Sequence, residues 1–214
     1  MREFASTFDG SVWFVANEQG VYAIDALDEG FQSIWELTNP GSYPDGVART
    51  ANGASFLVGR EVWLIELPSY RLRTRRTLPP MEKCVQCSKI ELASNGSAIC
   101  WVSDESTTSY GPVVHHAHAP AWVSLGAHVE RGEFAQTAID ESGSFGAFCH
   151  RVVDTCILKV FELREKRLLL EMHLEGAGRV SMRFQGKNLV VADESGRAIV
   201  VDVQRGKVVF EWRV

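Results

Sequence analysis

A histidine-rich stretch and a nearby pair of cysteines come closest to a metal site in this sequence. His116 and His118 lie two apart in "VVHHAHAP", so on a β-strand their imidazoles would point the same way. Cys84 and Cys87 form a Cys-x-x-Cys pair, which is half of a common zinc site. Cys87, however, falls where the strand pattern requires an apolar residue, and the histidines belong to a strand about two strands away. We therefore expect no metal site and no cofactor, and keep these four residues as the alternative ligand set.

Acidic residues on short β-runs raise the question of hydrolysis. Glu3, Glu91 and Asp140 occupy similar places in the sequence. A glycoside-cleaving enzyme needs two carboxyl groups roughly 5 to 9.5 Å apart across the sugar. The sequence contains no nucleophile elbow, P-loop or dinucleotide-binding fingerprint, and its connections are mostly too short to build a substrate pocket. We therefore expect no enzymatic activity and keep a five-bladed glycoside hydrolase-like enzyme as the last alternative.

Aromatic and histidine side chains near the longest connection are candidates for binding a protein partner. This connection, "SDESTTSYGP", covers residues 103–112. Loops on a rigid scaffold often carry recognition, and aromatic residues make good anchors. We expect Tyr110, His115, His116 and Trp122 to take part in binding at one face. A loop insertion without a binding role is the alternative.

An arginine-rich run, "RLRTRRT", is a second candidate for partner binding. On a regular strand Arg71, Arg73 and Arg75 share one face, with Arg76 on the other. Charges on an outermost strand discourage edge-to-edge pairing, which explains the run without a partner. The alternative is a patch for an acidic partner.

The elements that carry these residues form an internal repeat. A turn glycine followed by a β-run recurs five times, and the four steps between the glycines are 43, 43, 47 and 43 residues. The runs are "GSVWFVA" from Gly10, "GASFLVG" from Gly53, "GSAICWV" from Gly96, "GSFGAFC" from Gly143 and "GKNLVVA" from Gly186. Two further runs follow each one and an extended stretch precedes it, so each unit predicts four strands.

Four-stranded units at this spacing predict an all-β fold, a β-propeller of about five four-stranded antiparallel blades. Each sheet has two apolar faces that only neighbouring sheets can cover. We expect one domain over residues 1–214, with blades at approximately 1–38, 39–80, 81–127, 128–175 and 176–214. No swapped closing strand is evident, because the chain starts on a first strand and ends on a fourth. A closed ring is favoured; an open ring with two exposed apolar faces is the alternative.

The last unit, "RVSMRFQGKNLVVADESGRAIVVDVQRGKVVFEWRV", resembles divergent WD40-like or quinoprotein-like propeller repeats. In that family the third strand commonly ends in Trp-Asp, where this chain has Val201–Asp202 and, in the first unit, Ile24–Asp25. The Gly-His pair usual in the family is absent from all five units. The resemblance implies a binding platform rather than an enzyme.

Composition narrows the class of partner. The 214 residues carry a formal net charge of −5, which argues against nucleic-acid binding, and no apolar run is long enough to span a membrane. Five cysteines without a secretory signal predict reduced thiols and a cytoplasmic location. The sequence thus predicts a non-catalytic protein-interaction scaffold that binds another protein or itself, through a propeller face or an open blade. A lectin-like propeller that binds sugars or small molecules is the main alternative.

Overall fold

The computed structural model describes the backbone of most of the chain and the side chains of a smaller part. The described backbone covers residues 3–6, 11–17, 20–25, 30–36, 44–50, 53–58, 60–69, 71–81, 84–87, 90–104, 110–126 and 133–213. Side chains are described in residues 11–15, 22–24, 53–57, 60–69, 76–81, 90–102, 111–126 and 136–213. Within these ranges no helix has the length and apolar content needed to cross a bilayer.

Two sheets form the first part of the chain. Blade 1 consists of β1 (Glu3–Ser6), β2 (Val12–Asn17), β3 (Gly20–Asp25) and β4 (Gly30–Glu36). Blade 2 consists of β5 (Pro44–Thr50), β6 (Gly53–Val58), β7 (Glu61–Glu66) and β8 (Arg71–Thr77). In both blades every strand pairs antiparallel with the next strand along the chain.

Three sheets form the rest. Blade 3 consists of β9 (Cys84–Cys87), β10 (Glu91–Leu92), β11 (Ala98–Asp104), β12 (Tyr110–His115) and β13 (Val123–Ser124). Blade 4 consists of β14 (Glu133–Ile139), β15 (Phe145–Val152), β16 (Thr155–Glu162) and β17 (Arg167–Glu175). Blade 5 consists of β18 (Val180–Gln185), β19 (Asn188–Asp193), β20 (Arg197–Asp202) and β21 (Lys207–Arg213). In blade 3, β9 and β10 both pair with β11.

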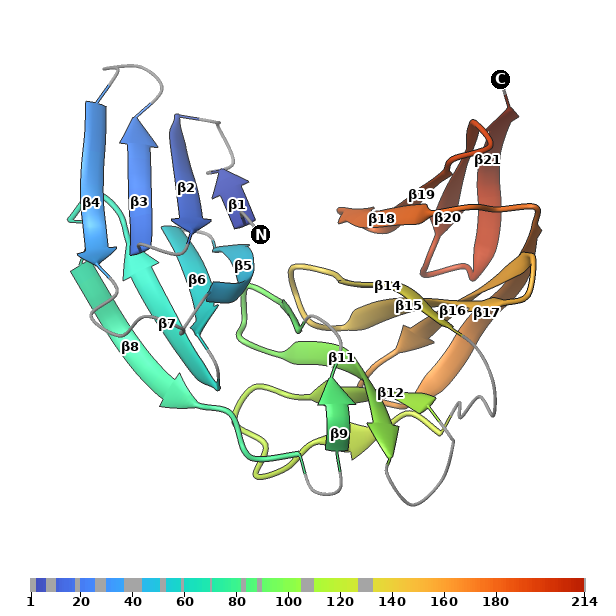
Figure 1. Cartoon of the computed structure of the whole chain (residues 1–214), viewed down its shortest axis with the longest axis horizontal. Helices are drawn as coiled ribbons and strands as arrows, with labels where there is room; N and C mark the ends of the chain where they lie inside the picture. Colours follow the sequence, from blue (N-terminus) through green and yellow to red (C-terminus); the bar gives the residue numbers. More distant parts are fainter. Residues whose placement is uncertain are drawn as a thin grey trace.

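The five blades stand side by side around an arc (Figure 1). Their inner strands β1, β5, β10, β14 and β18 lie next to one another in that order. The five-bladed β-propeller predicted from the repeat is therefore confirmed. A hairpin joins β16 to β17, and Lys166 in its turn has a left-handed φ of 53°.

In blades 2 to 5 the glycine that marks the repeat lies at or just before the start of the second long strand. Gly96, Gly143 and Gly186 have φ values of 83°, 69° and 57°, a left-handed region in which side chains with a Cβ are strained. Gly53 begins β6, and a Cβ there would collide with the carbonyl oxygen of Ile65. Gly10 lies outside the described residues. The regular spacing in the sequence thus reflects the same turn in successive blades.

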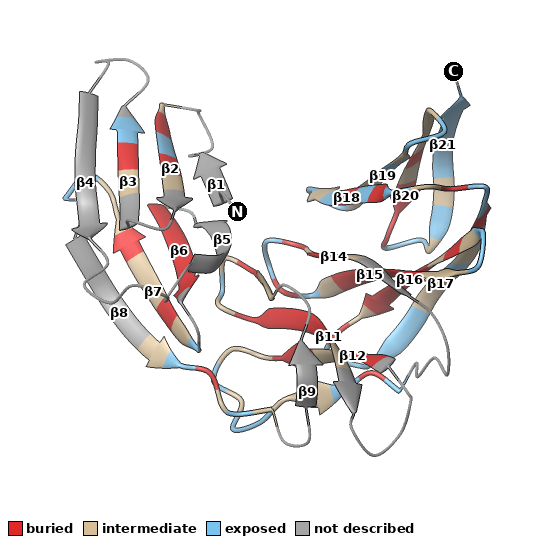
Figure 2. Ribbon diagram, in the orientation of Figure 1, coloured by how far each residue is buried: buried red, intermediate tan, exposed pale blue. Residues whose placement is uncertain are grey.

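Apolar clusters between consecutive blades form the core (Figure 2). Blades 1 and 2 share Val12, Phe14, Ala23, Ala54, Phe56 and Ile65; blades 2 and 3 share Leu57, Val62, Leu78, Leu92 and Ala98. Blades 3 and 4 share Ile99, Trp101, Val114, Leu125, Phe148, Phe161 and Leu163. Blades 4 and 5 share the largest cluster, which includes Leu158, Val160, Leu189, Ile199 and Val201. Each sheet is therefore held by the faces it presents to its neighbours.

The two ends of the arc do not meet. Figure 1 shows blade 1 and blade 5 apart, and among the described side chains no apolar cluster joins them. The favoured closed ring is therefore wrong for this structure, and the alternative, an open ring, describes it. Among the described side chains, four apolar clusters between consecutive blades hold the five sheets.

Candidate functional site

Blade 4 shows how a covered blade face is built. Its side toward blade 5 carries two rows of side chains that follow the cross-strand register of the sheet. The first row is Ala138, Ala147, Val160 and Leu170, and the second is Gln136, Cys149, Leu158 and Met172. Ala147, Cys149, Leu158 and Val160, on the two central strands, are fully buried. Burial beneath the next blade raises the pKa of the Cys149 thiol, and the nearby Cys156 thiol raises it further.

Blade 5 carries the equivalent rows on its side away from blade 4. The first is Arg183, Val190, Val200 and Phe210, and the second is Ser181, Ala192, Ala198 and Trp212. The two sheets match even in their irregularities, because a β-bulge interrupts the register beside Val160 in blade 4 and beside Val200 in blade 5. We call these eight residues of blade 5 the end face.

No described residue covers the end face. Its outermost strand, β21, is the most exposed part of the sheet (Figure 2). Phe210 is 56% exposed and Trp212 is 52% exposed. Both lie on β21, where they are two residues apart and so point to the same side. Large exposed aromatic side chains grouped on one side of a sheet are typical of an interaction surface.

Blade 1 presents an apolar face at the other end of the arc. Trp13 and Ile24 are cross-strand partners and are 41% and 38% exposed. Val15 and Tyr22 form the next pair and are half-buried. Phe14, which alternates with Trp13 along β2, is instead buried against blade 2. Trp13 is therefore not a core residue, although β2 lies between β1 and β3 in its sheet.

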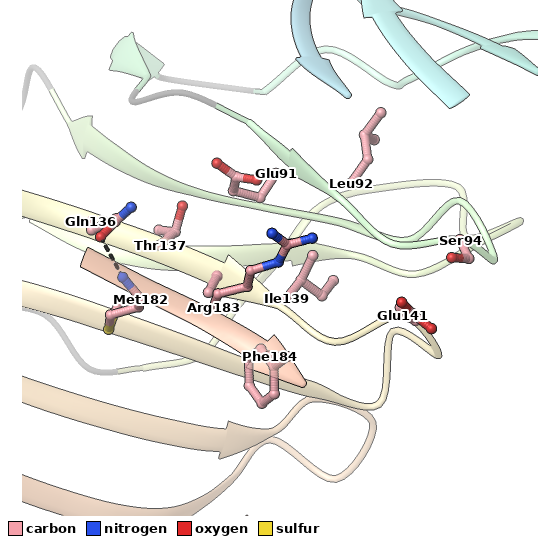
Figure 3. A pocket seen from close by; sticks show the side chains of 11 residues that line it. Glu91, Leu92, Ser94, Gln136, Thr137, Ile139, Glu141, Met182, Arg183 and Phe184 are labelled. Atoms are coloured by element: carbon pink, nitrogen blue, oxygen red, sulfur yellow. Dashed lines mark hydrogen bonds between the residues drawn. The ribbon is translucent and has the colours of Figure 1, made fainter. Parts of the chain in front are cut away.

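A polar cavity of about 160 Å³ lies along the inner strands β10, β14 and β18 (Figure 3). Its polar lining comprises Glu91, Ser94, Gln136, Thr137, Glu141 and Arg183. Oε1 of Gln136 accepts a hydrogen bond from the backbone N–H of Met182 at 2.7 Å, which joins blade 4 to blade 5 and fixes the amide. The cavity thus offers carboxylates, hydroxyls, an amide and a guanidinium to a small polar molecule.

The two described carboxylates considered for hydrolysis, Glu91 and Asp140, do not come together in this cavity. Glu91 lines it, but Asp140 does not. Asp140 is buried at the β14–β15 turn, where its carboxylate accepts hydrogen bonds from the backbone N–H groups of Phe145 at 2.6 Å and Ser142 at 3.1 Å. This carboxylate closes a turn, as Asp side chains often do. The side chain of Glu3 lies outside the described residues.

The aromatic and histidine residues predicted to bind a partner lie around the end of β12. His115 is buried, its Nε2 is 3.0 Å from the carbonyl oxygen of Ala119, and its ring centroid is 5.4 Å from that of Trp122. Trp122 is half-buried and donates from Nε1 to the carbonyl oxygen of Pro79 at 2.9 Å. Burial, opposed by the hydrogen bond with Ala119, lowers the pKa of His115. Both side chains therefore tie a turn to the blade 2–blade 3 connection.

The role of this region in partner binding stays a prediction, and only its accessible part could meet a partner. His116 is half-buried beside the buried His115. Tyr110 is the first residue of β12, but its side chain lies outside the described residues. The cluster predicted on one binding face is therefore partly interior.

The metal ligands considered in the sequence have a different geometry from the one expected. β12 ends at His115, so His116 and His118 do not share a strand, and His118 has a left-handed φ of 69°. The backbone N–H of Ala119 donates to the carbonyl oxygen of His116 at 3.0 Å and closes this turn. Cys84 and Cys87 bound β9, and their side chains lie outside the described residues. Among described residues, no three His, Cys, Asp or Glu side chains gather in a metal-binding group.

The arginine run lies on β8, the outer strand of blade 2. The register places Arg71 opposite Glu66 and Arg75 opposite Trp63, with a β-bulge between Leu64 and Ile65. The expectation that Arg71, Arg73 and Arg75 share one face stays a prediction. Their side chains lie outside the described residues, and their role in binding stays a prediction.

Sequence reasoning did not single out the end face or Arg183. A signal for the end face was present, because Phe210 and Trp212 alternate on a strand that the repeat makes outermost. Outermost strands normally carry charged or polar side chains, so two aromatic residues there indicate a contact. The cavity had no comparable signal, because three separate blades contribute to its lining.

Comparisons with known proteins support the fold. No family model and no curated protein matches the chain. The matching solved structures include one titled as a nidogen/laminin complex, with a TM-score of 0.58, 14% identity, and coverage of 97% of this chain and 78% of that one. The Dos1 propeller has a TM-score of 0.61 at 11% identity, and TolB from Acinetobacter baumannii has 0.56 at 10%.

The Dos1 and TolB matches cover nearly all of this chain but only about half of the other chain. The matches include 96% and 95% of this chain but 56% and 52% of the Dos1 and TolB chains, so this chain spans about half of each. At such low identity the likeness concerns the fold alone. The chain is therefore a β-propeller protein in architecture.

Proposed function

We propose that this protein is a non-catalytic interaction platform that binds a protein partner through the end face of blade 5. The observation that carries the proposal is the exposure of Phe210 and Trp212 beside the small apolar residues of β19 and β20. Aromatic side chains supply much of the binding energy at protein interfaces. The neighbour crystallised as a nidogen/laminin complex is an example of a propeller found with a protein partner.

The finer parts of this proposal follow from the sequence. The repeat pattern supports a WD40-like scaffold, although Val201–Asp202 replaces the usual Trp-Asp pair. We propose a cytoplasmic location, which is consistent with the free buried thiols of Cys149 and Cys156. The absence of recognisable catalytic motifs in the sequence supports a non-catalytic role.

A matched pair of variants tests the platform. Trp212→Arg places a charge on the end face, whereas Val153→Asp places one on an exposed apolar residue outside that face. Cross-linking and affinity capture from cell extract, followed by mass spectrometry, should recover a partner with the unaltered protein and with Val153→Asp. Recovery should fall at least tenfold with Trp212→Arg. Equal recovery by all three proteins, or no partner with any of them, would contradict the proposal.

A second candidate function is binding of a sugar or another small polar molecule. The observation that favours it is the cavity lined by Arg183, Gln136 and Thr137, whose amide and hydroxyl groups suit a polyol. A glycan array followed by calorimetry should then detect a ligand that Thr137→Val loses. An array without a ligand above background would remove this candidate.

A further inference from the structure

The cavity along β10, β14 and β18 has a buried hydroxyl group in its wall. Thr137 is 3% exposed and lines the cavity. It alternates on β14 with Gln136, which reaches blade 5, so its side chain points toward blade 3, and Figure 3 shows its hydroxyl oxygen directed toward Glu91. Among the described residues, no group forms a hydrogen bond with this hydroxyl. A buried polar group of this kind costs free energy until a ligand or a water satisfies it.

The guanidinium of Arg183 lies at the exposed side of the same cavity. The strand register counts Arg183 with the end face, but its long side chain lines the cavity, and Figure 3 shows it turned toward β14. No described residue forms a hydrogen bond or an ion pair with it. A carboxylate in the cavity can therefore pair with Arg183 without displacing a carboxylate of the described chain.

The charges of the lining favour a ligand that carries both signs. Glu91 on β10 is half-buried, and Glu141, just after β14, is exposed. An ionised carboxylate has several acceptor positions, so Glu91 can accept a hydrogen bond from a ligand as well as from the protein. The two carboxylates and the one guanidinium give the lining a net charge of −1. An anion would add to this negative charge, and a simple cation would be repelled by Arg183.

Contacts between blades fix the walls of the cavity. Oε1 of Gln136 accepts a hydrogen bond from the backbone N–H of Met182 at 2.7 Å, which joins β14 to β18. The backbone N–H of Ser94 donates to the carbonyl oxygen of Glu141 at 3.0 Å, which joins blade 3 to blade 4. Walls that are already ordered reduce the entropic cost of binding.

The size of the cavity limits the ligand. Its volume of about 160 Å³ has room for about ten water molecules, since each needs about 15 Å³. A water molecule has one non-hydrogen atom, so the cavity can hold a ligand of about ten such atoms. This is the size of a small amino acid or a single sugar ring.

We propose that this cavity binds a free amino acid in its zwitterionic form. The inference rests on the second candidate function, a small polar ligand in the cavity, and names the class of that ligand. The carboxylate of the amino acid pairs with Arg183, and its ammonium group donates to Glu91. The hydroxyl of Thr137 can donate or accept, and so forms a hydrogen bond with either group. A guanidinium and a carboxylate form a strong charge-assisted pair, which a neutral sugar does not offer.

Ligand-observed NMR with each common L-amino acid and with 4-aminobutyrate, at up to about 10 mM, tests this inference. Calorimetry then measures the dissociation constant of the compound that binds best. The α-amino acids and 4-aminobutyrate hold their two charges at different separations, so the comparison identifies the separation that the cavity fits. The deaminated acid and the decarboxylated amine of the same compound each lack one charge, and both should bind at least tenfold more weakly.

Four variants assign the binding to the cavity. Arg183→Gln and Glu91→Gln each remove one charge and should weaken binding at least tenfold, because a charge-assisted hydrogen bond is lost. Thr137→Val keeps the shape of the side chain without its hydroxyl and should weaken binding about fivefold. Arg179→Gln removes an exposed arginine of the same blade that does not line the cavity, and should bind like the unaltered protein. Circular dichroism spectra should confirm that every variant keeps its β-sheet.

The outcomes separate this inference from the proposed functions. The zwitterion site is overturned if no amino acid binds, if Arg183→Gln binds as well as the unaltered protein, or if the deaminated acid binds as well as the amino acid. A sugar that binds instead, and that Thr137→Val loses, overturns this inference and leaves the second candidate function standing. If neither class binds, both are overturned. Partner capture through the end face is measured separately, because Trp212 does not line the cavity.

Discussion

Blades 4 and 5 carry equivalent rows of side chains on the same side of the sheet, but their residues differ with their surroundings. The covered rows of blade 4 have Leu158 and Val160 in the centre and the flexible Met172 at the outer strand. The end face of blade 5 has Ala198 and Val200 in the centre and the aromatic Trp212 outside. Side chains that pack against a fixed neighbour fill the centre of the sheet, whereas those of the free face concentrate their apolar surface at its rim. Substitutions that shorten these side chains should therefore lower the free energy of unfolding by very different amounts in the two blades.

The largest effect is expected in the covered rows. Leu158→Ala removes a fully buried side chain between blades 4 and 5 and leaves a cavity. We expect the free energy of unfolding to fall by about 2 to 5 kcal/mol, measured by urea denaturation. Glu165→Ala, at an exposed residue of the same blade, should change it by less than about 0.5 kcal/mol. A Leu158→Ala variant as stable as this control would mean that blades 4 and 5 do not pack as described.

The hydrogen bond between Gln136 and Met182, which joins the same two blades, should contribute less to stability than Leu158. Gln136→Leu removes the acceptor for the Met182 backbone N–H and leaves that group without its partner. The expected loss is about 1 to 3 kcal/mol in urea denaturation. Gln136→Glu keeps an acceptor oxygen and should retain more of the stability. Equal losses in the two variants would show that the hydrogen bond does not matter.

A buried histidine makes the covered sheet sensitive to acid. The ring of His150 in blade 4 stacks on the ring of Trp101 in blade 3, with 5.5 Å between the ring centroids. The pKa of His150 is lowered from 6.5 to about 4, mainly by burial and also by Lys159 and His173, while Glu171 opposes them. Between these two values the unfolded chain binds a proton that the folded one does not, so stability falls as the pH falls.

The expected loss from pH 7 to pH 4 is about 1 to 2 kcal/mol, because charged neighbours and nearby solvent screen the ring. His150→Phe keeps a ring against Trp101 but cannot be protonated. Urea denaturation across this pH range should show a smaller decline for His150→Phe than for the unaltered protein. Parallel declines would assign the acid sensitivity to other groups.

The smallest effect on stability is expected at the free face. Trp212→Ser removes an aromatic side chain that is already half exposed, and should change the free energy of unfolding by less than about 0.5 kcal/mol at concentrations where the protein is monomeric. The same variant should markedly reduce the fluorescence of an apolar dye bound to the protein. A stability loss comparable to that of Leu158→Ala would show that the end face is covered in the monomer.

The repeat made the strands and blades predictable because it is local. Gly96, Gly143 and Gly186 each supply a left-handed turn, and the alternation of apolar residues on either side predicts paired strands. The hairpin between β16 and β17 followed from its position in the repeat despite good helix-forming residues in the turn. These signals depend on neighbouring residues in the chain, so no tertiary information was needed.

The candidate sites were less predictable because they depend on small departures from regular structure. A β-bulge interrupts the β7–β8 register beside the arginine run, and β12 ends before His116 and His118, of which His118 has a left-handed φ. Asp140 looks like a free carboxylate in the sequence but accepts two backbone hydrogen bonds in the fold. A single bulge or turn residue reverses the direction of the side chains that follow, and residue types alone do not indicate its position.

The sequence by itself determined a series of five antiparallel sheets, because turn glycines and alternating apolar residues act over a few residues at a time. Only the tertiary structure decided which faces of those sheets are covered, because covering a face requires another sheet that lies far along the chain. The apolar pattern of β21 is compatible with a buried strand or an exposed one. The open arc leaves Phe210 and Trp212 in contact with solvent, and so turns a possible core into a candidate binding surface.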